Sequence, residues 1–210
     1  MLDIKLCLLD FDGTLFDTIE SLYPVFINSF KDAGITITKE DCLPLTRVRL
    51  TEGYLMHAPN LDNIETYFKG IDKYLNSRET VEATKIYDDT IDFLNKVKEK
   101  GYKLGIVTSN NTLHVKEVLK FFNIDENLFS VYVGNKETKN HKPNPDPILY
   151  ALEHAGENYS KENVIYVGDA QADVECAKSA GVIPVLLDRN NEYNINDIKI
   201  IHSLNEIFKL

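Results

Sequence analysis

Cysteine is scarce in this chain, and its scarcity excludes two classes of protein. The 210 residues contain three cysteines, Cys7, Cys42 and Cys176, which are odd in number, widely separated and outside any Cys-x-x-Cys arrangement. Neither a disulfide framework nor a cysteine-based zinc site is therefore indicated. The composition suits a reducing compartment, and we expect a cytoplasmic protein.

Positive charge and long apolar runs are also lacking. Lys and Arg number 23 against 33 Asp and Glu, which gives a formal net charge of −10. That sign is unsuited to a protein that follows phosphate backbones or anionic lipid. The apolar run Leu6–Leu9 is too short for a signal peptide, and no stretch approaches the roughly 20 apolar residues of a membrane span. We therefore expect neither a nucleic-acid partner nor a membrane association.

The spacing of apolar residues divides the chain into a helical region and a region in which strands and helices alternate. From about Phe16 to Thr84 the apolar residues keep helical spacing, with helices expected from Ile19 towards Gly34 and over Asn63–Asn76, and with no strand signal. Pro24 should either kink the first of these helices or mark its true first turn. Residues 45–59 show no clear pattern.

After this region strands and helices alternate. Strands are expected at residues 4–9, 103–107, 129–133, 164–167 and 182–187, and the tail 198–210 should add a short strand and a helix. Alternation of this kind predicts a parallel sheet with helices on both faces. The predicted fold class is therefore α/β, with a catalytic core of residues 1–15 and 85–210 and an inserted all-helical cap domain of residues 16–84.

Polar side chains collect at one edge of this predicted sheet, because the carboxyl ends of its parallel strands share a crevice. Each of them follows a strand: Asp10 and Asp12 the first, Thr108 the second, Lys142 the third, and Asp169 with Asp173 the fourth. Carboxylates this close need a compensating cation. Hard oxygen ligands suit Mg²⁺, with water and a substrate phosphate completing its octahedron.

Four segments occur in an informative order: DFDGTLFDT at Asp10 to Thr18, GIVTSN at Gly105 to Asn110, HKPNPDP at His141 to Pro147, and YVGDAQADVECAKSAG at Tyr166 to Gly181. Together they resemble the motifs of the haloacid dehalogenase-like hydrolase superfamily, most closely its phosphoglycolate-phosphatase-like branch. The resemblance implies a Rossmann-like sheet with a helical cap, a Mg²⁺ cofactor, and hydrolysis of a small phosphorylated metabolite.

The resemblance also implies the catalytic roles. Asp10 would be the nucleophile that forms an aspartyl phosphate, and Asp12 would be the general acid for the leaving alcohol and then the base for water. A carboxylic acid can act in this way near neutral pH only with help from neighbouring charge or burial, and the surrounding carboxylates supply the charge. Asp12 also favours phosphate chemistry, since dehalogenases and phosphonate hydrolases of the superfamily lack this second aspartate.

The remaining expected roles concern phosphate and metal. Thr108, Lys142 and main-chain N–H groups near Gly13 and Ser109 would bind the phosphoryl group. The expected metal ligands are Asp10, the main-chain carbonyl of Asp12, and Asp169, with Asp173 either bound through water or fixing Lys142.

Structural alternatives exist for several of these residues. In the structural alternative, Thr108 only caps the following helix, and Asp173 is only a first-turn residue whose charge interacts favourably with the helix dipole. Lys142 has Lys136 and Lys139 as rivals within the same loop. Asp17 is interpreted as a cap residue.

Substrate choice is assigned to the cap, where four residues lie in the stretch without a pattern: Arg47, Arg49, Tyr54 and His57. Arg47 or Arg49 would face a second anionic group of the substrate, because guanidinium binds carboxylate and phosphate well. An exposed surface arginine is the alternative.

Two other functions stay open. A sugar phosphomutase of the β-phosphoglucomutase type would use the same Asp10 and Asp12 but return the phosphoryl group to the sugar. A non-catalytic binding protein on this fold is a different class, although the intact motifs argue against it. The sequence leaves a monomer and a homodimer equally open.

Overall fold

A computed structural model describes residues 2–46 and 48–210, and it divides into two compact units. Unit 1 consists of Met1–Phe16 and Ile86–Leu210, and unit 2 consists of Asp17–Lys85. None of the helices in the described ranges has both the length and the apolar character that crossing a membrane requires.

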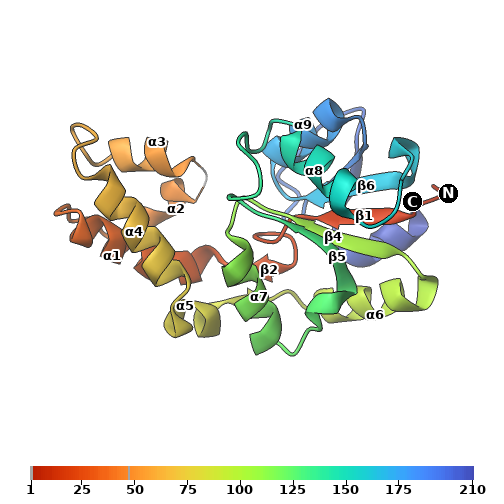
Figure 1. The fold of residues 1–210 in the computed structure, drawn as a ribbon, viewed down its shortest axis with the longest axis horizontal. Helices are drawn as coiled ribbons and strands as arrows, with labels where there is room; N and C mark the ends of the chain where they lie inside the picture. Colours follow the sequence, from red (N-terminus) through yellow and green to blue (C-terminus); the bar gives the residue numbers. More distant parts are fainter. Residues whose placement is uncertain (1, 47) are drawn as a thin grey trace. The chain divides into compact units, whose positions relative to one another are not determined.

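Unit 1 is built on a six-stranded sheet (Figure 1). Its strands are β1 (Leu6–Leu9), β4 (Lys103–Val107), β5 (Phe129–Val133), β6 (Val164–Gly168), β7 (Ile183–Leu187) and β8 (Lys199–Ile201). They lie in the order β5-β4-β1-β6-β7-β8, and each neighbouring pair is parallel. Within unit 1 this is the order 3-2-1-4-5-6 of a doubly wound sheet, in which ligands bind where the order reverses beside the first strand.

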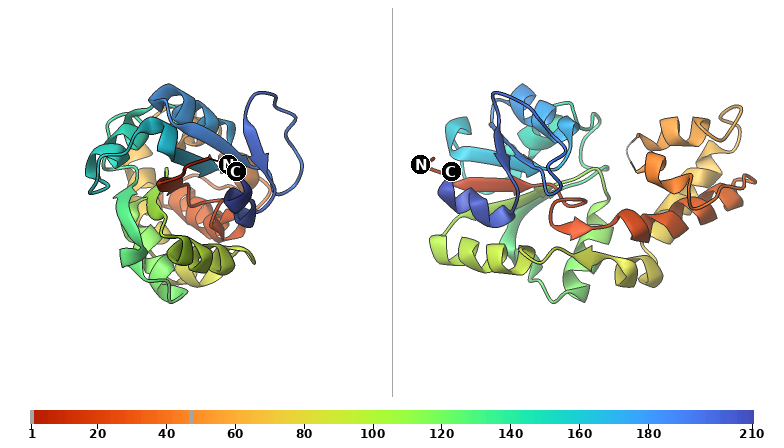
Figure 2. Two further views of the ribbon diagram at one scale, coloured as in Figure 1. Left: turned by 90° about the vertical axis from the view of Figure 1, so that its right-hand side faces the viewer. Right: turned by 180° about the vertical axis from the view of Figure 1, so that it is seen from behind.

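The helices of unit 1 cover both faces of the sheet (Figures 1 and 2). Helices α8 (Asp146–His154) and α9 (Gln171–Ala180) lie on one face, whereas α6 (Thr90–Lys100), α7 (Thr112–Phe121) and the 3₁₀ helix η3 (Leu204–Lys209) lie on the other. Two further 3₁₀ turns, Glu126–Leu128 and Lys161–Asn163, precede β5 and β6. Because both faces are covered, all four residues of β1 are buried and read as an uninterrupted apolar run.

The predicted α/β fold with a parallel sheet is confirmed. Two strands, β4 and β5, have the predicted bounds, and β1 and β7 begin one or two residues later than expected. Helix α6 ends at Gly101, where φ is 72°, a conformation that glycine adopts without strain.

Unit 2 contains α1 (Ile19–Asp32), α2 (Cys42–Leu45), α3 (Leu50–Leu55), α4 (Ile64–Leu75) and α5 (Arg78–Ala83). The two long helices that the apolar spacing predicts correspond to α1 and α4. Pro24 lies inside α1 and not in its first turn. The unit has its own apolar core, in which the rings of Phe30, Tyr54 and Tyr67 are mutual neighbours with centroids 4.7 to 5.8 Å apart.

The chain passes twice between the units, and each passage forms a two-residue strand. These are β2 (Phe16–Asp17) and β3 (Lys85–Ile86), which make a separate two-stranded sheet. The expectation that the region from Phe16 to Thr84 is free of strands is wrong at Phe16 and Asp17. A two-residue pairing of distant passages leaves no period in the sequence, so pattern reading cannot detect it. The role of unit 2 as a cap domain that chooses the substrate stays a prediction.

Candidate active site

The site lies at the carboxyl ends of the unit 1 strands, and main-chain hydrogen bonds fix its first residues. The Asp10 N–H, directly after β1, donates to the Val167 carbonyl oxygen at 2.8 Å. The Thr108 N–H, directly after β4, donates to the Val133 carbonyl oxygen at 2.8 Å. The parallel ladder therefore continues one residue beyond each strand and sets the direction in which both side chains leave the sheet.

Lys142 connects two carboxylates of this edge. Its Nζ lies 3.0 Å from Asp10 Oδ1 and 2.7 Å from Asp173 Oδ1, and all three side chains are at most 8% exposed. The structure thus brings Lys142 to the carboxylates, as the sequence predicts, while Lys139 is exposed on the loop. Burial alone lowers the pKa of Lys142, but the two carboxylates outweigh burial and raise it above its usual value, so the ammonium form persists.

Asp10 is held in a strongly perturbed environment. Burial raises the pKa of Asp10 well above its usual value, Lys142 lowers it, and the neighbouring carboxylates raise it further. Burial and the Asp173 carboxylate likewise raise the pKa of Asp169 to about 6. Ionising all of these groups together is therefore costly without additional positive charge.

Asp173 is the most thoroughly anchored of these carboxylates. Its Oδ2 accepts a hydrogen bond from the Ala170 N–H at 3.0 Å, at the start of α9, while Oδ1 accepts from Lys142. The Tyr166 hydroxyl lies 3.0 Å from Oδ1 and 2.8 Å from the Val107 carbonyl oxygen, so its one proton is shared between them. Asp173 therefore both caps the N-terminus of α9 and fixes Lys142.

Sequence reasoning missed Tyr166, whose hydroxyl is one of these anchors. Tyr166 is a buried residue in the middle of β6. Its signal was available in the sequence, because a hydroxyl in an otherwise apolar strand needs a buried hydrogen-bond partner.

A cluster of oxygen ligands fits a divalent cation. Asp10, Asp169 and Asp173 each offer a carboxylate oxygen, and these atoms lie within 4.8 Å of one another. With Asp12 the edge carries four carboxylates, of which Lys142 can offset only part. Carboxylate oxygens with room for water are the donors that Mg²⁺ prefers, so the donor set matches the predicted metal.

Two glycines make room for these carboxylates. A Cβ at Gly13 would overlap the carboxylate of Asp169, and a Cβ at Gly168 would overlap the carboxylate of Asp173. Gly13 also has φ of 76°. Its N–H donates to the Phe16 carbonyl oxygen at 2.8 Å, and phosphate binding by main-chain N–H groups near Gly13 stays a prediction. The contribution of Gly13 is space for the Asp169 side chain.

Asp12 is held by neutral partners. The Asn110 Nδ2 lies 3.3 Å from Asp12 Oδ1 and 3.2 Å from Oδ2, and the Thr108 hydroxyl lies 3.4 Å from Oδ2. Thr108 does not cap α7, because that helix is capped by the Asn111 side chain, which accepts from the His114 N–H at 2.8 Å. Asn110 is the last residue of the GIVTSN segment, and the sequence alone predicts no role for it.

The structure gives less information about the other residues that the sequence predicts for phosphate binding and substrate choice. Ser109 is exposed beside Thr108, and its phosphate contact stays a prediction. In unit 2, Arg49 is exposed just before α3, and Arg47 lies outside the described residues. Tyr54 is 2% exposed within the aromatic core of unit 2, so its ring packs the interior of the unit.

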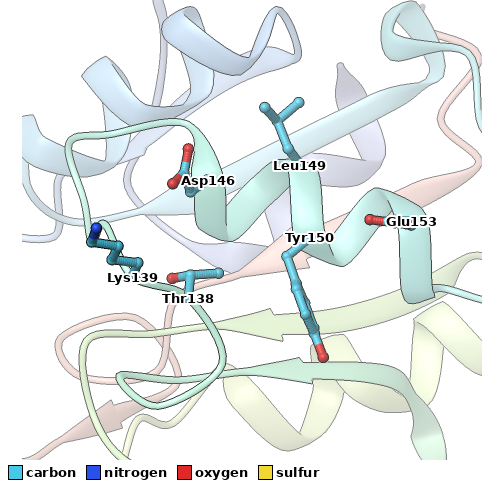
Figure 3. A pocket seen from close by; sticks show the side chains of 6 residues that line it. All are labelled: Thr138, Lys139, Asp146, Leu149, Tyr150 and Glu153. Carbon is cyan, nitrogen blue, oxygen red and sulfur yellow. The ribbon is translucent and has the colours of Figure 1, made fainter.

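A hollow elsewhere on unit 1 contains none of these residues (Figure 3). It has a volume of about 320 Å³ and lies between helix α8 and the loop before it. Its lining residues are Thr138, Lys139, Asp146, Leu149, Tyr150 and Glu153. Figure 3 shows their side chains leaving α8 and the loop in different directions, without polar groups that converge on one point. No chemistry is assigned to it.

Comparison with known proteins gives consistent matches. The profile of the haloacid dehalogenase-like hydrolase family matches residues 7–186. A relative from Caldanaerobacter subterraneus subsp. tengcongensis, which bears the provisional name pyrophosphatase PpaX, is 35% identical over 187 residues, covering 85% of this chain and 79% of the relative. The phosphoglycolate phosphatase of Escherichia coli is 28% identical over 215 residues, covering 91% of this chain and 84% of that enzyme.

A solved structure agrees with these matches. The haloacid dehalogenase-type phosphatase of Thermococcus onnurineus superposes with a TM-score of 0.72 at 27% sequence identity. The superposition covers 98% of this chain and 97% of the phosphatase. The likeness therefore extends over both units of the chain.

Proposed function

Since the chain belongs to the haloacid dehalogenase-like hydrolase family, we propose that it is a Mg²⁺-dependent phosphatase acting on a small phosphomonoester through an aspartyl phosphate on Asp10. The observation that carries the proposal is the cluster of Asp10, Asp169 and Asp173, in which the Lys142 ammonium pairs with the buried carboxylates of Asp10 and Asp173. Relatives named as a phosphoglycolate phosphatase and as a pyrophosphatase support phosphate hydrolysis.

Asp10 is the residue suited to attack phosphorus. Its N–H is fixed to β6 and its carboxylate contacts Lys142, so the nucleophile needs little reorganisation when a substrate arrives. The Lys142 ammonium favours the ionised form that attack requires. When bound, Mg²⁺ would offset the carboxylate charge and polarise a phosphate oxygen.

The other residues divide between charge and proton transfer. Lys142 and the Thr108 hydroxyl stabilise negative charge on the oxygens of the transferring phosphoryl group. Asp12 gives a proton to the leaving oxygen and then takes one from the water that hydrolyses the aspartyl phosphate. Asp10, Asp169 and Asp173 would hold the cation, and Asp173 also keeps Lys142 in place.

Phosphate release from a panel of substrates tests this proposal. The panel contains 2-phosphoglycolate, pyrophosphate and several sugar phosphates, each assayed with Mg²⁺ and with chelator. We expect Mg²⁺-dependent release that falls at least about 10³-fold in Asp10→Asn. Asp62→Asn, an exposed aspartate of unit 2, serves as the control and should keep full activity. Release that ignores the chelator, or that survives Asp10→Asn, contradicts the proposal.

The mutase alternative requires a separate measurement. Sugar phosphates from the same panel are incubated with the enzyme, and free phosphate is counted against isomerised product. A phosphatase yields free phosphate in proportion to substrate consumed, whereas a phosphomutase yields isomer with little free phosphate. A predominance of isomer would replace the proposed function with the mutase.

A further inference from the structure

We infer that Asn110 is a positioning residue that holds the Asp12 carboxylate in the direction needed for proton transfer, an inference that rests on the proposed function. Asn110 Nδ2 lies 3.2 and 3.3 Å from the two carboxylate oxygens of Asp12. Because Asn110 contacts both oxygens, it restrains the orientation of the Asp12 carboxylate plane as well as the position of the group. These two residues come from the loops after β4 and β1 in unit 1, where the sheet topology brings them together.

The orientation of the Asn110 side-chain amide is fixed by the hydrogen bond that its oxygen accepts. Asn110 Oδ1 accepts a hydrogen bond from the Asn111 N–H at 2.8 Å. A flipped amide would place Oδ1 against the Asp12 carboxylate, where two acceptors repel, and would leave the Asn111 N–H facing an NH₂ group. The network therefore allows only the orientation in which the NH₂ group faces Asp12.

The main chain of Asn110 is equally constrained. Its N–H donates to the Thr108 hydroxyl oxygen at 3.1 Å, and its carbonyl oxygen accepts from the Asn135 N–H at 3.0 Å. Gly134 packs so closely that a Cβ there would overlap the Asn110 carbonyl oxygen. All four polar groups of this residue, which is 9% exposed, are thus engaged. A side chain this well fixed can position a neighbour at little entropic cost.

The partner types distinguish the two aspartates. Asp10 contacts the ammonium of Lys142, whereas Asp12 is held by an amide and a hydroxyl, which carry no net charge. A neutral donor fixes the carboxylate geometrically without pairing its charge. Asn110 therefore orients Asp12, which transfers the proton, whereas Lys142 places a positive charge beside Asp10, which attacks phosphorus.

The test compares two substrates that differ in their need for a proton. An alkyl phosphate such as 2-phosphoglycolate has a poor leaving group that requires protonation, whereas p-nitrophenyl phosphate releases a stable anion. In Asn110→Ala and Asn110→Ser we expect kcat/KM to fall about 10-fold or more for the alkyl ester and less than about threefold for the aryl ester. Ser retains a hydroxyl that can accept from the Asn111 N–H, so it preserves the fold if Ala does not.

Asn111→Ala is the matched control. Asn111 is an adjacent buried asparagine whose side chain caps α7. Its variant should lose stability in thermal unfolding without any difference between the two substrates. In an Asp12→Ala background, Asn110→Ala should cause no further loss, because the residue it positions is absent.

The outcomes separate this inference from the proposed function. An equal loss on both substrates, or an additional loss in the Asp12→Ala background, overturns the positioning role while the phosphatase proposal stands. A wild-type protein that hydrolyses no phosphoester overturns the proposed function and this inference with it.

Discussion

At the scale of the residue, Gly13 and Gly34 share a backbone conformation but differ in surroundings. Their φ angles are 76° and 82°, in the left-handed region that favours glycine. A Cβ at Gly34 meets nothing within 4 Å, whereas a Cβ at Gly13 overlaps the Asp169 carboxylate. Substitutions at these two glycines therefore distinguish the effect of backbone strain alone from the effect of displacing the Asp169 carboxylate.

We predict that Gly13→Ala and Gly34→Ala each lower the free energy of unfolding by about 1 kcal/mol, the cost of placing alanine at positive φ. Only Gly13→Ala should lower activity, by about 100-fold, because Asp169 must move. Urea unfolding and phosphate release measure the two effects. Equal activity in both variants would show that the space beside Asp169 has no catalytic importance.

Residues of the site differ in how far the sequence can identify them. Asp10, Thr108 and Lys142 could be assigned to one edge because each follows a predicted strand, and topology alone brings such positions together. Asn110 and Tyr166 act through the orientation of a single side chain, which depends on hydrogen-bond partners far away in the sequence. Similarly, the engagement of the Gly13 amide by Phe16 follows from the local turn and not from residue type.

At the scale of the element, one ion pair joins several parts of unit 1. Asp89 lies just before α6, Arg189 follows β7, and their side chains form two hydrogen bonds of 3.0 and 3.2 Å. Arg189 also donates to the Thr14 carbonyl oxygen at 2.8 Å, in the loop that carries Asp12. The Ser203 hydroxyl and the Leu204 N–H, at the start of η3, donate to Asp89 at 2.7 and 2.8 Å.

This network predicts a pH-dependent contribution to stability. Burial raises the pKa of Asp89, but the hydrogen bonds from Arg189, Ser203 and the Leu204 N–H outweigh burial and leave the pKa below its usual value. A carboxylate with a lowered folded-state pKa stabilises the protein above its unfolded pKa of about 4, and this contribution is lost as the pH falls through the folded value.

Asp89→Asn should therefore lower the free energy of unfolding by about 3 kcal/mol at neutral pH, by leaving Arg189 unpaired. The difference from wild type should shrink below pH of about 4, as the wild-type carboxylate becomes protonated. Urea unfolding across this range is the measurement. Asp92→Asn, which removes an exposed pair with Lys96 on the same helix, should cost less than about 1 kcal/mol. A difference for Asp89→Asn that is constant with pH contradicts the prediction.

Elements were predictable where the sequence carries a period. The buried apolar run of β4 and the alternating buried residues of the edge strand β5 gave the bounds of these strands directly. Helix α3 escaped prediction because LTEGYL contains a glycine and too few apolar residues to show a helical repeat; its buried residues are Gly53 and Tyr54. The short strands β2 and β3 depend on pairing between distant passages, which local sequence does not report.

At the scale of the whole molecule, the two ends of unit 1 that border the insertion lie next to each other. The Tyr87 N–H donates to the Leu15 carbonyl oxygen at 3.5 Å, and the Thr90 hydroxyl donates to the same oxygen at 2.9 Å. Strands β2 and β3 continue this proximity at the passages themselves. Hydrogen bonds within unit 1 therefore hold together the two points of the chain between which unit 2 is inserted.

We predict that unit 1 folds when residues 17–85 are replaced by a short Gly-Ser link. Among the described residues, its six-stranded sheet and the core cluster that includes Leu6, Leu8 and Tyr166 consist of unit 1 residues. Circular dichroism should show retained helix and strand, and urea should unfold the shortened chain in one cooperative transition. A shortened chain that aggregates or shows no cooperative unfolding would mean that unit 1 depends on unit 2.

The adjacency of Leu15 and Tyr87 has a consequence in polymer terms. The entropic cost of closing a chain segment rises only with the logarithm of its length, about 0.6 kcal/mol for each doubling. An insertion whose two ends are already joined through unit 1 can therefore grow, shrink or be exchanged with little change in the stability of the sheet. A fold organised in this way can keep one set of carboxylates at the edge of its sheet while accepting helical insertions of many sizes.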